Sequence, residues 1–243
     1  MARVIPPDRF AAVVDAAART FIAHGYQRAQ VQDVADALAV AKGTLYVYAQ
    51  GKAALFAAAI RYADRVEPLP GPGDLPVPAP SEGEVAAVVT ARLAGELADL
   101  ALTRALARPA GGESPAELAS IVTDLCARLG RHRVAIKLVD RCAPELPDLA
   151  EVWFGSGRWA LVAALQEYLR RGQASGGLAL AGPTPLVART VVELCALWAV
   201  HAHFDPSPVP PGAPTAGHVD ETTVTAALAA FVARATSPDS PGI

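Results

Sequence analysis

The sequence predicts an all-α protein: an N-terminal three-helix helix-turn-helix domain followed by a C-terminal helical bundle. Apolar residues recur at helical spacing along most of the chain, and no segment shows the alternation typical of a β-strand. Residues 68–81 are dense in proline and glycine and separate a head from a body. Residues 1–66 hold eight Lys or Arg and five acids, although the whole chain has a net charge of −3. A basic head suits DNA binding by one end of the protein, and a merely solvated surface explains the same excess equally well.

Composition excludes several classes of protein. The chain has 243 residues, of which 52% are hydrophobic and 19% charged, and this balance favours a folded protein over a disordered one. No apolar run approaches the roughly 20 residues of a membrane span, and the N-terminus has no signal-peptide core. Cys126, Cys142 and Cys195 lie far apart and fit neither a disulfide framework nor a zinc site. We therefore expect a cytoplasmic protein with no membrane partner.

The first helix is predicted from Asp8 to Ala23. Pro6 and Pro7 precede it, Asp8 can cap it, and Gly25 stands at the usual C-terminal position. One apolar stripe follows its length and predicts a core-facing side: Phe10, Val13, Val14, Ala17, Ala18, Phe21 and Ile22.

Residues 30–49 read as two short helices joined by a tight turn. Val31, Val34, Ala35 and Leu38 repeat at helical spacing, and a second segment follows from Ala41 to Tyr48. Small, cationic and hydroxyl side chains are what a helix needs to enter the major groove of DNA. The second segment offers them at the positions predicted to be exposed: Lys42, Gly43, Thr44, Tyr46, Val47 and Tyr48.

These residues carry a resemblance to a known family. The run Lys42–Tyr48, the later Lys52 and Leu55-Phe56, and the earlier AAxxFxxxGY pattern at residues 17–26 are similar to the N-terminal domain of TetR-family transcriptional regulators. The resemblance implies a helix-turn-helix that binds double-stranded DNA, a body that binds a small molecule, and a homodimer. The predicted DNA-contacting residues are Gln30, Lys42, Gly43, Thr44, Tyr46, Val47, Tyr48 and Lys52.

Several positions depart from the family pattern. Ala39 stands where a turn glycine is usual, Ala41 where a capping serine is usual, and Ala49 where a phenylalanine usually packs. Gly51 replaces another cap, and Ala29 with Gln30 replaces a threonine-type helix start. A lost cap costs about 1 kcal/mol, and a left-handed alanine costs roughly 1–2 kcal/mol.

The predicted organisation follows the composition. We expect a helix-turn-helix domain at 1–51, a connecting helix at 52–67, a linker at 68–81, a helical body at 82–236 and a disordered tail at 237–243. Within the body the expected helices are Glu82–Ala107, Pro115–Cys142, Asp148–Arg171, Pro183–Phe204 and Glu221–Ala235. A linker directly after the connecting helix would leave that helix free to swing, and a plain flexible linker is the alternative.

The last two predicted helices are apolar on more than one face. Leu186, Val191, Leu194 and Trp198 cover much of the helix at 184–204, and Phe231 belongs to a stripe in the helix at 221–235. Such helices need a partner, and the resemblance implies a homodimer through both of them. Burial inside a monomer is the alternative.

Polar residues within the apolar body helices are candidates for a pocket that binds an unknown small-molecule effector. For any one of them, a surface or core role competes with ligand contact. The candidates are Arg104, His132, Lys137, Trp153 and Trp159.

The sequence holds no constellation for catalysis or metal binding. Phosphate-binding glycine loops, GxSxG and HExxH are all missing, and His201 and His203 would point to different faces of a helix. We therefore expect no enzyme, no metal and no cofactor. The favoured hypothesis is a ligand-responsive transcriptional repressor that binds a palindromic operator as a homodimer. The alternative is a helical dimer that binds a small molecule or a protein partner and whose head no longer reads DNA.

Overall fold

The computed structural model describes residues 7–204 and 220–238, and these are helical or lie in loops and turns. They contain one isolated β-bridge and no named strand, so the all-α prediction is confirmed. The chain forms two compact units. The first unit holds the residues up to Ala91 together with His132–Gly155, and the second holds Arg92–Arg131 together with the residues from Ser156 onward. These units cut the chain at other places than the predicted domain boundaries, which stay predictions.

The first unit is built on the helix that the sequence predicted most clearly. α1 (Pro7–Arg28) packs against α4 (Lys52–Tyr62), with α2 (Val31–Ala37) and α3 (Lys42–Leu45) between them in the chain. The apolar stripe of α1 is buried, as its spacing predicts, except for Ile22, which is half-buried. The rings of Phe21 and Phe56 meet edge to face with centroids 5.1 Å apart, and the Tyr26 ring lies 5.1 Å from Phe56. This aromatic cluster fixes the angle between α1 and α4.

A later stretch of the chain completes the same unit. α8 (Arg133–Cys142) packs against both α1 and α4. Both carboxylate oxygens of Asp64, just beyond α4, accept hydrogen bonds at 2.8 Å, from the backbone amides of Val134 and Ala135. The amide of Gln27 donates to Glu145, which belongs to a 3-10 turn at Ala143–Glu145. The head is therefore held by residues more than 100 positions away in the sequence.

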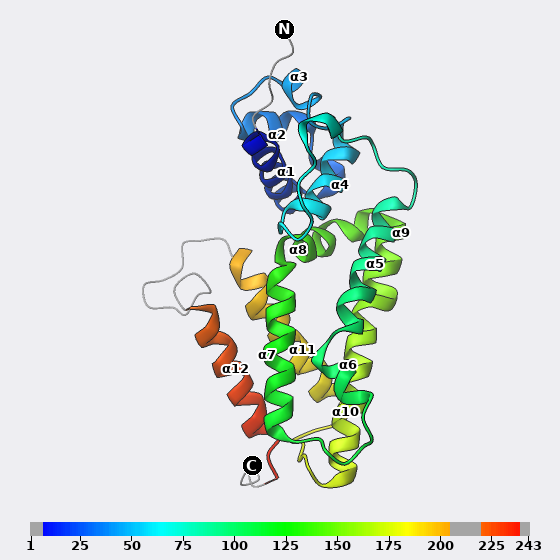
Figure 1. The fold of residues 1–243 in the computed structure, drawn as a ribbon, viewed down its shortest axis with the longest axis vertical. Helices are drawn as coiled ribbons and strands as arrows, with labels where there is room; N and C mark the ends of the chain where they lie inside the picture. Colours follow the sequence, from blue (N-terminus) through cyan, green and yellow to red (C-terminus); the bar gives the residue numbers. More distant parts are fainter. Residues whose placement is uncertain (1–6, 205–219, 239–243) are drawn as a thin grey trace. The chain divides into compact units, whose positions relative to one another are not determined.

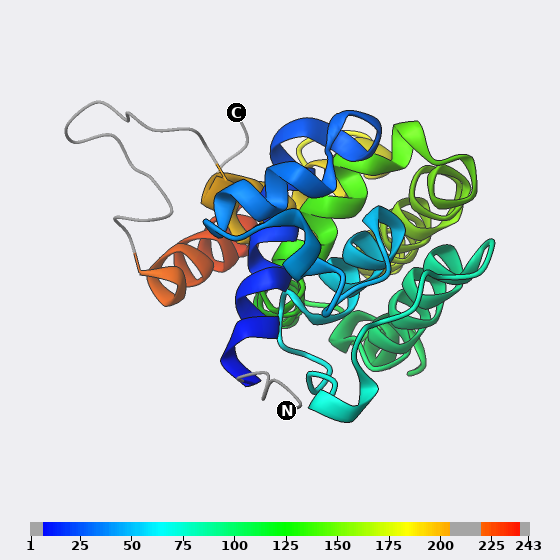
Figure 2. The ribbon, with the colours of Figure 1, turned by 90° about the horizontal axis from the view of Figure 1, so that it is seen from above.

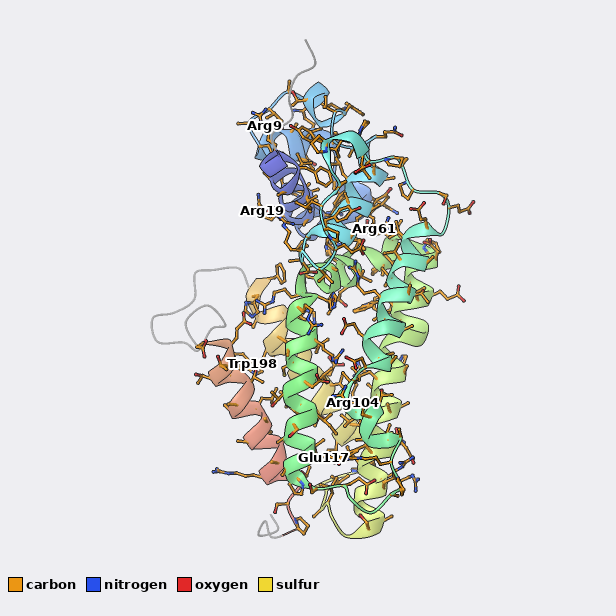
Figure 3. The ribbon with its side chains drawn as sticks, in the orientation of Figure 1. Arg9, Arg19, Arg61, Arg104, Glu117 and Trp198 are labelled. Atoms are coloured by element: carbon orange, nitrogen blue, oxygen red, sulfur yellow. The ribbon has the colours of Figure 1, made fainter. Side chains whose placement is uncertain are left out.

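The second unit surrounds α7 (Pro115–Arg131). α12 (Glu221–Ala235) and α11 (Thr184–Ala199) pack on α7, while α10 (Arg158–Ser175) packs on α11 and on α6 (Ala101–Leu106). α12 lies at the edge of this unit in both views (Figure 1 and Figure 2). The Tyr168 hydroxyl donates to Glu117, which is labelled on α7 in Figure 3, at 2.8 Å. Burial and that carboxylate raise the pKa of Tyr168 above its ordinary value.

A half-buried arginine ties two segments of the second unit together. Arg128 on α7 is 12% exposed and pairs with Glu96 at 2.9 Å, Asp99 at 2.9 Å and Asp124 at 3.1 Å. Glu96 lies near the end of α5 (Glu84–Ala98), and Asp124 also accepts from the first amide of α6 at 2.8 Å. Hydrogen bonds to these carboxylates, that to Asp99 foremost, raise the pKa of Arg128.

Two predicted body helices are each interrupted, so those predictions are wrong in extent. The expected helix Glu82–Ala107 is divided between α5 and α6, because the carboxylate of Asp124 caps α6 at Ala101. The expected helix Pro115–Cys142 breaks at His132, whose φ of −112° and ψ of 20° are not helical. There the first amides of α8 bond to the Asp64 side chain instead of continuing the helix of α7.

The later boundaries also move. A short helix α9 (Pro147–Ala150) and a π-helical turn at Glu151–Gly157 precede α10, which ends at Ser175 and not at Arg171. Gly176 stops it with φ 73°, and Leu178 donates back to the Gly172 carbonyl at 3.0 Å. The expected helix Pro183–Phe204 breaks at Val200 and finishes as a 3-10 turn at His201–Phe204. The expected helix Glu221–Ala235 is confirmed.

The head helices differ from prediction at their ends. α1 continues to Arg28 across a kink at Gly25, where φ is 79°. α4 ends at Tyr62 and not at Val66, and Arg65 beyond it has a positive φ of 58°. The Arg65 guanidinium bonds both oxygens of Asp15, at 2.8 and 2.9 Å, which holds this turn against α1. The side chain of Asp8 and most of the predicted tail at 237–243 lie outside the described residues.

The proline-rich segment 68–81, called the strap below, is not a free linker. A 3-10 turn forms at Pro72–Asp74. Val77 pairs in parallel with Ala49 and exchanges two backbone hydrogen bonds with residues 48 and 50. In Figure 1 the strap is the cyan segment that runs from the end of α4 toward α3 and then turns back to α5. The expectation that this segment leaves α4 free to swing is therefore not supported.

One helix of the second unit is long and apolar. Thr184–Phe204, counted through its final turn, is by length and composition able to cross a membrane, with a mean hydropathy of 1.3. The prediction that no apolar run approaches this length is wrong, because Arg189 and Glu193 are the only acidic or basic residues among these 21, histidine aside. Only 28% of its apolar window is buried, so much of its surface is left uncovered.

Candidate nucleic-acid interface

The candidate interface is the segment from Gln30 to Gln50. α2 and α3 pack on each other, and α2 also contacts α1. Val34 and Ala35 of α2 are 1% and 0% exposed, and Leu45 of α3 is 1% exposed. The apolar spacing that predicted a helix-turn-helix therefore forms its core. α3 is shorter than the predicted segment Ala41–Tyr48, because residues beyond Leu45 continue as turns and then pair with the strap.

Most of the residues predicted to face DNA lie at the surface. Tyr46 is 48% exposed and Val47 is 45% exposed, so two adjacent large side chains of the motif are left outside its core. Lys42 and Gly43 are exposed and Thr44 is half-buried. A Cβ added to Gly43 would meet no atom within 4 Å, so the backbone is open to a close approach from outside. The arrangement offers one cation, one hydroxyl, one phenol and the apolar side chain of Val47 to a groove.

Tyr48 is an exception. The prediction that its side chain is exposed is wrong, since it is only 4% exposed. Its carbonyl accepts a hydrogen bond from Val77 at 2.9 Å, and the adjacent Ala49 is 1% exposed. The strap therefore turns residues 48 and 49 inward, where the sequence pattern of the short helix alone pointed Tyr48 outward.

Lys52 and Gln30 have intramolecular roles. The Lys52 ammonium donates to the carbonyl of Gln27 at 2.9 Å and lies 4.7 Å from the centre of the Tyr26 ring. These partners explain a lysine at a helix start without a phosphate, and its contact with DNA stays a prediction. Gln30 is exposed at the N-cap of α2, where its backbone amide donates to the Asp33 carboxylate at 2.8 Å.

Two alanines occupy demanding backbone positions in the motif. Ala39 has a φ of 52°, which places a residue with a Cβ in the left-handed region of the turn. Ala41 is the N-cap of α3 and has no side chain with which to cap it. Gly51 is the N-cap of α4 with φ 97°, a conformation that suits glycine. The helix-turn-helix thus forms with less local stabilisation than its pattern allows.

Burial sets the chemistry of the groups behind the interface. Desolvation raises the pKa of Tyr26, with the nearby Cys142 as a smaller cause. Desolvation also raises the pKa of the Cys142 thiol to about 12, and this thiol donates to the Phe21 carbonyl at 3.8 Å. Cys142 is therefore a neutral core residue and not a reactive thiolate.

The residues predicted to bind an effector are divided between the two units. His132, Lys137 and Trp153 belong to the first unit, whereas Arg104 and Trp159 belong to the second. Trp153 donates to Asp140 at 3.3 Å. Trp159 is 52% exposed under the guanidinium of Arg189, and Arg104 is exposed and pairs with Asp99. Their role in ligand binding stays a prediction.

The first unit contains a cleft of about 620 Å³. Tyr26 and Phe56 contribute to one side, and the segments Pro80–Gly83 and Leu146–Leu149 contribute to the others. None of the five predicted effector-binding residues lines it. Among residues 7–204 and 220–238, no group of three or more His, Cys, Asp or Glu could hold a metal ion.

Sequence reasoning missed one participant in the interface. Val77 lies 29 residues beyond Tyr48. Its two backbone hydrogen bonds hold the end of residues 42–50, called the recognition segment below. The signal available was its position between Pro76 and Pro78, since a residue before proline favours the extended conformation of an edge strand. The sequence pattern did not predict that Val77 pairs with residues 48–50.

Comparisons with known proteins agree with this geometry. Residues 13–59 match the profile of the family described as bacterial regulatory proteins, tetR family. Among curated proteins, nothing matches the chain.

Two solved structures share the fold over nearly their full length. A bacterial regulatory protein in the tetR family from Rhodococcus RHA1 has a TM-score of 0.51 at 15% identity, with 96% of this chain and 98% of that chain covered. The ketosteroid transcriptional regulator KstR2 of Mycobacterium tuberculosis has a TM-score of 0.55 at 15% identity, with 96% and 97% covered. Identity this low shows the fold alone, and the profile match is confined to the head: residues 13–59 match the tetR family of bacterial regulatory proteins.

Proposed function

We propose that this protein is a ligand-responsive transcriptional repressor that binds a palindromic operator in double-stranded DNA as a homodimer. The observation that carries the proposal is the exposure of Tyr46 and Val47 beside Lys42 in the helix-turn-helix. Large side chains at the surface of an otherwise well-packed motif indicate a surface that is covered by a partner. In a motif of this family the partner is DNA.

The homodimer is supported by the uncovered face of the last two helices. Leu186 is 62% exposed, Leu197 is 44% exposed and Phe231 is 61% exposed. These side chains lie on the segments 184–204 and 221–235, where the sequence predicts the interface. A twofold dimer would present two helix-turn-helix motifs to half-sites about one DNA turn apart.

The proposed response to an effector follows from linkage. A small molecule that favours one spacing of the two heads must lose affinity by the same factor when operator DNA favours another. The solved relative from Mycobacterium tuberculosis is described as a ketosteroid regulator, which supports a small-molecule effector for this fold. Native mass spectrometry of the purified protein would detect a copurified molecule. A regulator of this kind acts in the cytoplasm without a cofactor.

The test measures binding to the DNA around the protein's own coding region, by fluorescence anisotropy at several salt concentrations. Because each neutralised phosphate releases counterions, log affinity should fall with log salt at a slope of roughly 0.9 per contact. The double variant Lys42→Ala, Tyr46→Ala should lose this binding. Arg170→Ala removes one positive charge on α10 and should leave DNA binding unchanged. Retained binding by the double variant would refute the assignment of the contacts.

A second candidate function is a helical dimer that binds a small molecule or a protein partner and whose head no longer reads DNA. The strained turn at Ala39 and the uncapped start of α3 at Ala41 favour it. The same measurement decides between the two. A wild-type protein that fails to bind any fragment of that DNA at low salt supports this second function.

A further inference from the structure

The strap has a sequence that fixes its own conformation. Prolines at 76, 78 and 80 alternate with Val77 and Ala79. Each proline fixes its own φ and biases the residue before it toward the extended region. Val77 and Ala79 are also the only backbone N–H donors between residues 76 and 80. Residues 76–80 of the strap are therefore biased toward an extended conformation before they meet any partner, and little conformational entropy is lost when they pair.

One of these two N–H donors, that of Val77, bonds to the recognition segment. The amide of Val77 donates to the carbonyl of Tyr48, and the amide of Gln50 donates to the carbonyl of Val77, both at 2.9 Å. Only one residue separates Tyr48 from Tyr46, so these bonds fix the backbone directly behind the exposed pair Tyr46 and Val47. Tyr48 and Ala49 are buried as a result.

Both ends of the strap are ordered by local hydrogen bonds as well. At one end the Gly71 amide donates to Asp74 at 3.1 Å and closes the 3-10 turn. At the other, the amide and hydroxyl of Ser81 both donate to Glu84 at 3.0 Å, which ties the strap to the first turn of α5. Those hydrogen bonds also lower the pKa of Glu84. The segment between Val77 and α5 is thus short and ordered, so a displacement of the start of α5 can move Val77 and the residues that pair with it.

We infer that the strap is a positioning element for DNA recognition. Val77 holds the recognition segment in the orientation that turns Tyr46 and Val47 outward. Because the strap runs straight into α5, it gives this segment a second connection to α5 that bypasses α4. The inference rests on the proposed function and adds to it the backbone of residue 77, which does not itself touch DNA.

The test compares two substitutions at one position. Val77→Pro removes the donor to Tyr48, whereas Val77→Ala keeps it and shortens the side chain. Losing the hydrogen bond that orders the segment should weaken binding to the DNA fragment by about tenfold. Val77→Ala should bind within about twofold of wild type. Hydrogen exchange of the Gln50 amide should accelerate in Val77→Pro and not in Val77→Ala.

The outcomes separate the two proposals. If wild type binds DNA and Val77→Pro binds equally well, the positioning role is refuted and the proposed function stands. If wild type binds no DNA, the proposed function falls and the positioning role falls with it. Circular dichroism checks the fold of each variant. Should Val77→Pro fail to fold, the pair Pro76→Gly, Pro78→Gly keeps the donor and loosens the strap. Weakened binding by that pair supports the role, and unchanged binding refutes it.

Discussion

At the scale of single residues, Ala39 shows strain within the helix-turn-helix. Its φ of 52° is a glycine conformation, and its side chain is exposed, so nothing packs against the Cβ to compensate. Ala39→Gly should raise the free energy of unfolding by roughly 0.5–1 kcal/mol, because relief of the left-handed strain exceeds the entropy that glycine loses on folding. Thermal or urea unfolding measures the difference.

The matched control lies two residues earlier. Ala37 ends α2 in the same motif and is also exposed. Ala37→Gly should lower the free energy of unfolding by roughly 0.5–1 kcal/mol, since glycine is unfavourable in a helix. If both glycines change stability in the same direction, the strain at residue 39 does not control the turn.

Glu167 on α10 should contribute to the acid limb of stability. Hydrogen bonds from Arg170 and then Arg171 lower its pKa from 4.5 to about 2. A carboxyl whose folded pKa is depressed adds stability above its unfolded pKa and loses it as pH falls toward the folded value. Unfolding measured from pH 6 to pH 2 should therefore lose part of its pH dependence in Glu167→Gln, mostly below about pH 4.5. An unaltered acid limb would show that solvent screens this exposed cluster.

Much of the local pattern was predictable from sequence because it depends on neighbours within a few residues. The stripe of α1, the core positions Val34, Ala35 and Leu45, and the helix at 221–235 all follow from apolar spacing. Tyr48 was not predictable in this way, because its backbone pairs with Val77, a residue far away in the sequence. The same holds for the break at His132, which depends on a carboxylate at position 64.

At the scale of elements, Asp64 joins α4 to α8 by capping. Its two oxygens accept from the second and third amides of α8, which leaves those donors without a helical partner if the carboxylate is removed. Asp64→Ala should lower the free energy of unfolding by about 1 kcal/mol, within a range of roughly 0.5–2 kcal/mol. Urea unfolding checks the value.

Asp36 provides the comparison for this substitution. It is an exposed aspartate on α2 whose side chain accepts only a surface bond from Gln32 at 2.7 Å. Asp36→Ala should change stability by less than about 0.5 kcal/mol. Equal losses at positions 36 and 64 would argue against a specific cap at α8.

At the scale of the whole molecule, the uncovered apolar face of α11 and α12 should decide the oligomeric state. Burying a large apolar side chain contributes about 1.5–3 kcal/mol, so Phe231→Asp should raise the dissociation constant of the proposed dimer by at least about tenfold. Leu186→Asp should act in the same direction. Sedimentation velocity across a concentration series measures the effect.

The control is an exposed apolar residue elsewhere. Val66 is 42% exposed just beyond α4 in the first unit. Val66→Asp adds the same charge and should leave the sedimentation coefficient at the wild-type value. If Val66→Asp dissociated the dimer and Phe231→Asp did not, the proposed interface on α11 and α12 would be wrong.

The discontinuity of the first unit bears on how this protein can be taken apart. A fragment cut near residue 66, as the profile match at 13–59 invites, would lack α8 and with it the partners of Phe21, Gln27 and Asp64. Such an excised piece would present an apolar face of α1 and α4 to water. Ribosomal synthesis meets the same constraint, because the head cannot acquire its full set of contacts until the chain has been made beyond residue 145.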